Sequence, residues 1–129
     1  AIAGRRVRAA RVRAVRDYGF ALLETIPGVV CNGHRRARLA NNINISLPGF
    51  DTEYAVIALD AAGIAAATKS ACAGKGGGRS EVVYAMTGDE ARSRATLRFT
   101  LTPQTAKSDM RRLARALAAH VRRVADVSA

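Results

Sequence analysis

The sequence predicts an α/β domain of the two-layer α+β type, in which helices cover a small, mostly antiparallel sheet. Short segments that alternate apolar and polar residues lie between longer helical patterns, the element order is αββαβαβα, and no segment repeats another. The chain has 129 residues, of which 49% are hydrophobic, so it is long enough to bury a core without a disulfide or a metal. We therefore interpret residues 1–129 as one domain.

The first and last elements are predicted to be basic helices. Over residues 1–24, apolar side chains recur at steps of three and four, as on a helix with one buried stripe. The stripe consists of Val7, Ala10, Ala14, Tyr18 and Ala21. Over residues 105–125, Thr105 is expected to cap a second helix. Its apolar stripe consists of Met110, Leu113, Leu117, Val121 and Val124.

The excess positive charge lies in these two helical segments. The formal net charge is +11, with 18 arginines and three lysines against ten acidic residues. Residues 1–38 carry +7, residues 39–110 are neutral, and residues 111–129 carry +4. Basic faces opposite a buried stripe are usually solvated, and the alternatives are contacts with a nucleic acid, another anionic partner or a neighbouring domain.

Between these helices, short strands alternate with shorter helices. Strands are expected over residues 29–31, 43–47, 64–68 and 95–101. In the second of them, apolar and polar residues alternate with the two-residue period of a half-buried strand. The apolar residues are Ile43, Ile45 and Leu47, and the polar ones are Asn42, Asn44 and Ser46. Two helices are expected between the strands, over 51–62 with Asp51 as cap and over 80–86 with Ser80 as cap.

One segment has a composition that costs free energy on folding and suits a functional role. Residues 69–79 contain Cys72 and four glycines in five residues, which predicts a mobile loop. Positive charges at Lys69 and Lys75 are expected to favour the thiolate, the nucleophilic form of cysteine. Cys31 lies in an apolar strand and is expected to be a small buried residue. Neither cysteine has a second Cys or His at the spacing of metal ligands.

The glycine-rich segment also has an RNA-binding interpretation. Gly74-Lys75-Gly76-Gly77 resembles the G-x-x-G loop of KH-type RNA-binding domains, and a basic α/β chain of this size suits them. However, Gly78-Arg79-Ser80-Glu81 separates this loop from the helix that should follow it directly. The spacing of a phosphate-binding P-loop does not occur. A KH-like RNA-binding module therefore stands as an alternative.

Several segments taken together resemble one enzyme family. They are Leu23 to Gly33, Arg38-Leu39-Ala40-Asn41-Asn42-Ile43-Asn44-Ile45-Ser46-Leu47-Pro48-Gly49, Leu59 to Ala65, Ser70-Ala71-Cys72, and Ala95-Thr96-Leu97-Arg98-Phe99-Thr100-Leu101. In order and spacing they resemble the C-terminal small domain of cysteine desulfurases, which are pyridoxal-phosphate enzymes of the class V aminotransferase superfamily. The resemblance implies the C-terminal-domain fold of that superfamily.

The resemblance also implies roles for individual residues. Cys72 matches the loop cysteine that takes sulfur from L-cysteine as a persulfide and leaves L-alanine. Arg98 matches the strand arginine that binds the substrate carboxylate, a task that suits the forked guanidinium group. The asparagines expected to line the same cleft are Asn41 and Asn42, and the residues expected to support the loop are Lys69, Ser70 and Lys75.

The chain departs from the family at the cofactor. The family binds pyridoxal phosphate through a Ser-x-His-Lys motif in a larger domain, whereas here His34 precedes Arg35 and His120 precedes Val121. We therefore expect the chain to be inactive alone and to be completed by a cofactor-binding large domain or subunit. The other expected partners are a second copy in a homodimer and a sulfur-acceptor protein, and nucleic acid is not favoured. The apolar runs are too short to span a membrane, and a cytoplasmic location is expected.

Three alternatives stay open at this point. The substrate is cysteine, selenocysteine or another substrate of the superfamily. The sulfur goes to iron–sulfur cluster assembly, to tRNA modification or elsewhere. Besides the KH-like module, the chain is interpretable as a degenerate relative that serves only as an interaction domain.

Overall fold

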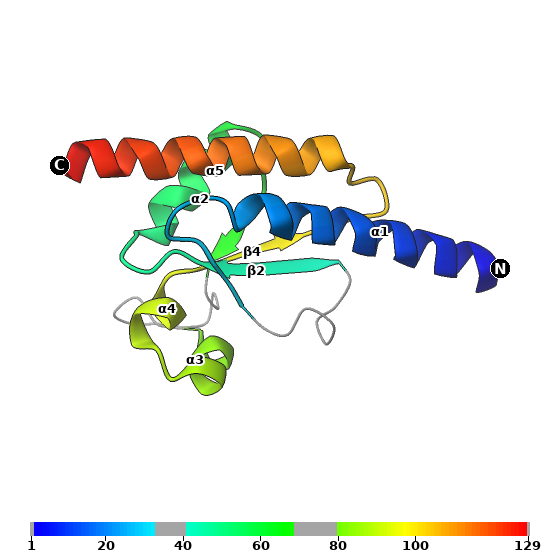
Figure 1. The fold of residues 1–129 in the computed structure, drawn as a ribbon, viewed down its shortest axis with the longest axis horizontal. Coiled ribbons are helices and arrows are strands. Elements are labelled where there is room, and N and C mark those ends of the chain that lie inside the picture. Colours follow the sequence, from blue (N-terminus) through cyan, green and yellow to red (C-terminus); the bar gives the residue numbers. More distant parts are fainter. Residues whose placement is uncertain (1, 33–40, 69–79, 129) are drawn as a thin grey trace.

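The computed structural model describes residues 2–32, 41–68 and 80–128. Its elements are, in order, α1 (Ile2–Leu23), β1 (Val30–Cys31), β2 (Asn42–Ser46), α2 (Thr52–Ala61), β3 (Ala67–Thr68), α3 (Glu81–Thr87), α4 (Glu90–Arg94), β4 (Thr96–Thr100) and α5 (Lys107–Ser128). Helices α1 and α5 run side by side over one face of the sheet, and α3 and α4 lie on the other side, near one end (Figure 1). The predicted α+β class with a small antiparallel sheet is confirmed.

The strands form a four-stranded antiparallel sheet in the order β1-β2-β4-β3. The two central strands pair over five residues, and this register places Ile45 opposite Leu97 and Asn44 opposite Arg98. Because successive side chains on a strand point to opposite faces, the apolar residues of both strands share one face and the polar residues share the other. The alternation predicted for residues 43–47 therefore extends across the sheet.

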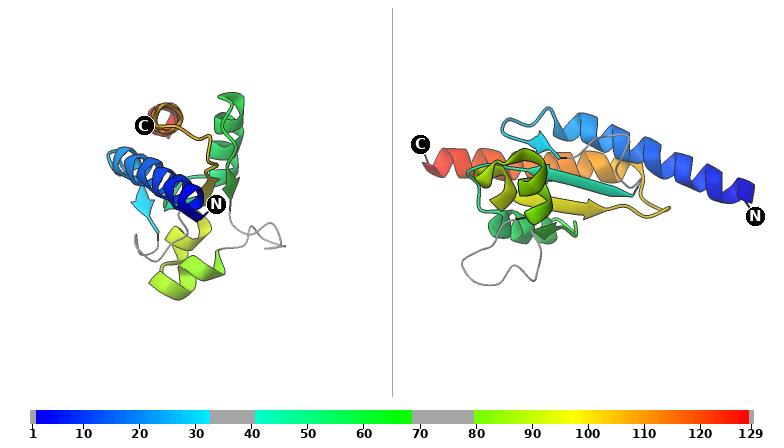
Figure 2. Two further views of the ribbon diagram at one scale, coloured as in Figure 1. Left: turned by 90° about the vertical axis from the view of Figure 1, so that its right-hand side faces the viewer. Right: turned by 90° about the horizontal axis from the view of Figure 1, so that it is seen from below.

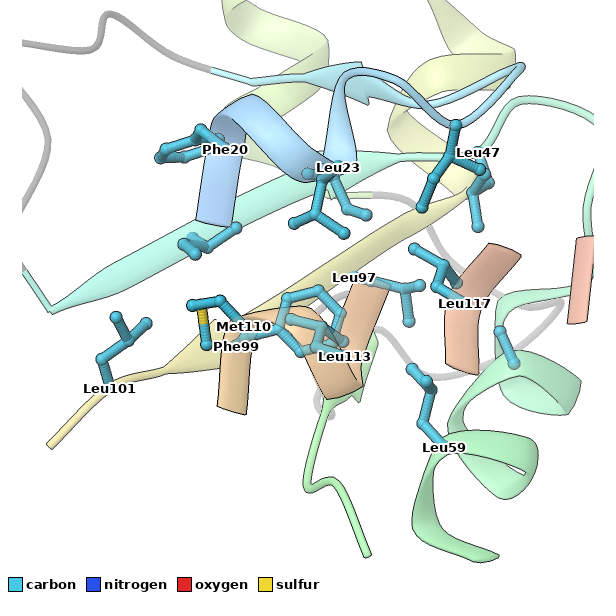
Figure 3. Packing of buried hydrophobic residues seen from close by; sticks show 14 of the residues in the cluster. Phe20, Leu23, Leu47, Leu59, Leu97, Phe99, Leu101, Met110, Leu113 and Leu117 are labelled. Carbon is cyan, nitrogen blue, oxygen red and sulfur yellow. The ribbon is translucent and has the colours of Figure 1, made fainter. Parts of the chain in front are cut away.

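The core lies between the apolar face of the sheet and the three helices α1, α2 and α5 (Figure 3). It contains Phe20, Leu23, Leu47, Leu59, Leu97, Phe99, Leu101, Met110, Leu113 and Leu117. Helices α1 and α5 approach closely at Gly19, where an added Cβ atom would lie 2.6 Å from Sδ of Met110. A larger residue at this position would force the two helices apart or displace the methionine.

The buried stripe predicted for the first helix is wrong. Val7 is 67% exposed, and Ala10, Ala14 and Ala21 are exposed as well. The buried apolar residues of α1 are Val12, Val15, Phe20 and Leu23. The helix carries two apolar stripes, and the one with larger side chains faces the core because it removes more apolar area from water.

The chain also contains a helix that the predicted order αββαβαβα lacks. Helix α4 has five residues, and the side chain of its N-cap, Asp89, accepts a hydrogen bond from the backbone N of Arg92 at 3.0 Å. Directly before it, Gly88 ends α3 with a φ of 67°, a left-handed conformation that favours glycine. A helix of one turn is too short to show a helical period, so only its cap marks it in the sequence.

The caps of the longer helices follow the prediction in two cases out of three. Asp51 caps α2 and Ser80 caps α3. Thr105 does not cap α5, because its hydroxyl accepts from the backbone N of Thr102 at 2.9 Å. At the start of α5, Oδ2 of Asp109 instead accepts from the backbone N of Ala106 at 2.8 Å.

The buried residues of α5 agree with its predicted stripe. Met110, Leu113 and Leu117 are buried, and Val121 and Val124 are half-buried. Within the described residues, no helix combines the length and the apolar character needed to cross a membrane.

Candidate functional site

The candidate site is the polar face of the sheet, on the side away from α1 and α5. Its residues on the two central strands are Asn42, Asn44, Ser46, Thr96, Arg98 and Thr100. Ser46 and Thr96, at one end, are buried, whereas Arg98 and Thr100 are exposed. Helices α3 and α4 lie on this side of the sheet, at one end of it (Figure 2). The polar face therefore has a covered end and an open end.

Arg98 occupies the middle of this face. It lies in β4 between two neighbouring strands, opposite Asn44 of β2 and Ala67 of β3. Its side chain is exposed, and it has no ion pair or hydrogen bond with any residue that the structure describes. An arginine without an acidic partner, set between a small residue and an amide, is suited to bind a carboxylate with its forked guanidinium.

The structure places only one of the two predicted asparagines on the sheet face that carries Arg98. Asn42 starts β2 on the polar face, opposite Thr100, and is half-buried. Asn41 is exposed, and its carbonyl accepts from the backbone N of Leu101 at 2.8 Å. Because Leu101 belongs to the apolar face, the alternation of the ladder places Asn41 on that side as well. Asn42 is thus the better candidate for contact with a ligand of Arg98.

The predicted nucleophile and loop residues, Cys72, Lys69, Ser70 and Lys75, lie outside the described residues. The structure describes the residues at both ends of that segment. Thr68 pairs with Leu97, and the backbone N of Ser80 donates to the carbonyl of Ser93 at 2.7 Å. The segment therefore begins beside β4 and ends next to the helix that precedes β4.

A buried hydrogen-bond network that the sequence analysis did not predict lies at the covered end of the polar face. Its centre is Asn32, whose side chain is 3% exposed. Nδ2 of Asn32 donates to Oδ1 of Asn44 at 2.7 Å and to Oγ of Ser46 at 2.8 Å. Nε of Arg92 donates to Oδ1 of Asn32 at 2.7 Å. The network thereby links α4 to β2.

Two further hydrogen bonds close this network. Nη2 of Arg92 donates to the carbonyl of Cys31 at 2.9 Å, and Oγ of Ser46 donates to the carbonyl of Arg92 at 2.8 Å. Only part of this network is indicated by a local sequence pattern. Asn44 shares the alternation of Asn42, but Arg92 contacts a residue 60 positions away, which no local pattern reveals.

A second feature lies between α2 and α5, two of the three helices on the apolar side of the sheet. It is a hollow of about 650 Å³ lined by Asp51, Tyr54, Ile57, Ala58, Ala61, His120, Arg123 and Val124. His120 is 5% exposed, and its Nε2 is buried with no hydrogen-bond partner among the described residues. Burial, together with the nearby charge of Arg123, lowers the pKa of His120. Both effects favour the neutral form of the imidazole.

The described residues do not fit pyridoxal phosphate. That cofactor is held in enzymes through a lysine, and the described lysine is Lys107, at the start of α5. Its Nζ lies 5.4 Å from the centroid of the Tyr18 ring, in the helical layer over the apolar face. No lysine among the residues that the structure describes therefore reaches the polar face.

The chain is similar in sequence to several curated enzymes, although no family model matches it. Cysteine desulfurase IscS 1 of Archaeoglobus fulgidus is 33% identical over 120 residues, or 93% of this chain. Cysteine desulfurase IscS of Dictyoglomus turgidum is 35% identical over 78% of the chain, and cysteine desulfurase 2 of Trichormus variabilis is 29% identical over 92%. The chain spans only 31%, 26% and 30% of these relatives.

Solved structures with the same fold are NifS-like proteins. The one from Rickettsia africae superposes with a TM-score of 0.69 at 19% identity and covers 84% of this chain. A second NifS-like protein has a TM-score of 0.73 at 16% identity and covers 88%. The chain spans 27% and 28% of these two proteins. Together with the sequence relatives, they confirm the resemblance inferred from the sequence.

Proposed function

We propose that this chain, a relative of the cysteine desulfurases over most of its length, supplies two essential side chains of such an enzyme. Cys72 receives sulfur from L-cysteine, and Arg98 binds the carboxylate of that substrate. The observation that carries the proposal is Arg98, an exposed guanidinium without an acidic partner among the described residues, in the middle of a polar sheet face.

The covalent chain limits the distance between Cys72 and the strand that carries Arg98. Thr68, the last described residue before the segment, pairs with Leu97, the neighbour of Arg98. Cys72 is four residues further along, and an extended chain advances about 3.3–3.6 Å per residue, so its Cα lies within about 14 Å of that of Thr68. This bound allows the thiol and the guanidinium to share one site.

In the proposed reaction, the thiolate of Cys72 attacks the sulfur atom of L-cysteine. A sulfur–sulfur bond forms while the carbon–sulfur bond breaks, and the bonding electron pair stays with the carbon. Protonation of that carbon gives L-alanine, and Cys72 is left as a persulfide, so no external oxidant or reductant is needed. Stabilising that electron pair is the chemistry that pyridoxal phosphate supplies when it is bound.

The cofactor and the partner proteins are supplied by other parts of the proposed enzyme. Because the described lysine, Lys107, lies over the apolar face, we propose that a large domain or subunit binds pyridoxal phosphate. A homodimeric enzyme, a sulfur-acceptor protein and a cytoplasmic location belong to the same proposal. The curated relatives favour it over the KH-like alternative, whose Gly74-Lys75-Gly76-Gly77 segment lies outside the described residues.

The experiment compares the two cysteines in the enzyme completed with its cofactor-binding domain. Cys72→Ala should abolish formation of L-alanine and of a protein persulfide from L-cysteine. Cys31→Ala is the control, because Cys31 packs half-buried against the core on β1, and it should retain both activities. Persulfide formation by Cys72→Ala at the rate of the unsubstituted enzyme would show that Cys72 is not the nucleophile.

A further inference from the structure

We infer that Asn44 is a second ligand of the substrate carboxylate, donating from Nδ2 beside Arg98, and that Asn32 and Arg92 are its positioning residues. The inference rests on the proposed function, because it concerns the carboxylate that Arg98 is proposed to bind. It adds a role for the buried network, which links the covered end of the polar face to its middle.

The register of the sheet places Asn44 next to the proposed carboxylate site. Asn44 and Arg98 are directly opposite each other on β2 and β4. The Cβ atoms of such a pair lie about 4.5–5.5 Å apart and point to the same face. A carboxylate offers about four lone-pair sites, of which a guanidinium fork occupies two. An amide beside the fork can therefore donate to the same carboxylate.

The hydrogen bonds determine which end of each amide faces which neighbour. A guanidinium has donors and no acceptor, so the atom of Asn32 that faces Nε of Arg92 must be its oxygen. The nitrogen of Asn32 then faces Asn44, and the atom of Asn44 that accepts from it must be Oδ1. The NH₂ group of Asn44 is consequently turned away from Asn32, with no acceptor among the described residues.

The network that imposes this orientation is anchored at several points and shielded from water. Arg92 is held by the carbonyl of Cys31, and its own carbonyl accepts from Ser46. The backbone N of Arg92 also donates to Asp89, the cap of α4. Because Asn32 and Ser46 are buried, water does not compete for these bonds. The amide of Asn44 is thus held in place before any ligand binds.

The test uses Asn44→Asp in the completed enzyme. Aspartate has nearly the shape of asparagine and still accepts from Nδ2 of Asn32, but it replaces the NH₂ group by an anionic oxygen. Two competitive inhibitors separate the effects, because L-alanine carries the carboxylate and cysteamine is cysteine without it. We expect the inhibition constant of L-alanine to rise about tenfold or more and that of cysteamine to stay unchanged.

Two further variants control for charge and for position. Thr100→Asp places a carboxylate on the same face, two residues from Arg98, and leaves the amide of Asn44 intact. It should therefore raise the inhibition constant of L-alanine less than Asn44→Asp does. Asn32→Asp keeps the acceptor for Arg92 but removes the donor to Asn44. It should raise the inhibition constant of L-alanine and not that of cysteamine, because the amide of Asn44 is then free to rotate.

Arg98→Gln, measured in the same way, separates the possible failures. If Arg98→Gln leaves inhibition by L-alanine unchanged, the proposed carboxylate site is wrong. If Arg98→Gln weakens inhibition by L-alanine, the carboxylate site stands. If Asn44→Asp then weakens inhibition by neither compound, or by both equally, only the role of Asn44 is wrong. Because an aspartate at position 44 lies opposite Arg98 and can pair with it, Asn44→Leu is measured as well, since it removes the donor without adding a charge. It should also weaken inhibition by L-alanine and not by cysteamine, and unchanged inhibition by L-alanine would show that the role of Asn44 is wrong.

Discussion

The two faces of the sheet are built from the same strands, yet their side chains have opposite environments. Leu97 and Arg98 are neighbours in β4, and one is fully buried under the helices while the other is exposed on the far side. Side chains on the apolar face contact α1, α2 and α5. On the polar face, side chains at one end form a hydrogen-bond network, whereas the side chain of Arg98 forms no hydrogen bond with a described residue. Strand alternation thus allows one segment both to stabilise the domain and to present a functional group.

The largest expected effect separates these two neighbours. Leu97→Ala should lower the free energy of unfolding by about 2–5 kcal/mol, because it removes buried apolar atoms and leaves a cavity. Arg98→Ala should change it by no more than about 0.5 kcal/mol, since the side chain is exposed and has no partner among the described residues. Urea unfolding of both variants measures the difference, and equal losses would break the comparison.

The next effect distinguishes the two ends of the polar face. Asn32→Ala should cost about 1–3 kcal/mol of stability, because the buried donors and acceptors of Arg92, Asn44 and Ser46 lose their common partner. Asn42→Ala, on the same face, should cost much less, because Asn42 has no side-chain hydrogen bond with a described residue. Thermal unfolding followed by circular dichroism tests this, and a larger loss for Asn42→Ala would contradict the network's structural role.

The smallest effect concerns a polar group on the apolar side. Because burial lowers the pKa of His120, the unfolded chain binds a proton at a higher pH than the folded chain does. This contribution to stability is fully present above the ordinary histidine pKa of about 6.5 and is lost as the pH falls towards the lower, folded value. When the pH is lowered from about 7.5 to 5.5, the free energy of unfolding should therefore fall less for His120→Leu than for the unsubstituted chain. Parallel urea unfolding curves at the two pH values measure this, and identical losses would contradict it.

The local parts of the fold follow from local sequence patterns. The alternation in residues 43–47 predicts which face of β2 is buried, and the caps Asp51 and Ser80 mark the start of two helices. The first helix shows the limit of such patterns, because it has two apolar stripes and only packing against α5 and the sheet selects one. Periodicity shows that a stripe exists but does not show which partner it meets.

The candidate site depends on contacts that are distant in the sequence. Nothing local connects Arg92 with Asn32, because their bond depends on how α4 lies against the sheet. The exposure of Arg98 follows from its strand alternation, but its place opposite Asn44 requires the register of β2 and β4. Neither the strand pattern nor the register shows what Arg98 binds, and its carboxylate-binding role is a proposal that rests on a family resemblance.

The most direct test of the division between the two faces is the Michaelis constant for L-cysteine of the completed enzyme carrying Arg98→Gln. The account predicts a KM raised about tenfold or more, as expected for loss of a charge-assisted bidentate contact, with an unchanged midpoint of thermal unfolding. An unchanged KM, or a rise explained by a lower unfolding midpoint, would contradict the claim that the polar face of the sheet is the functional face.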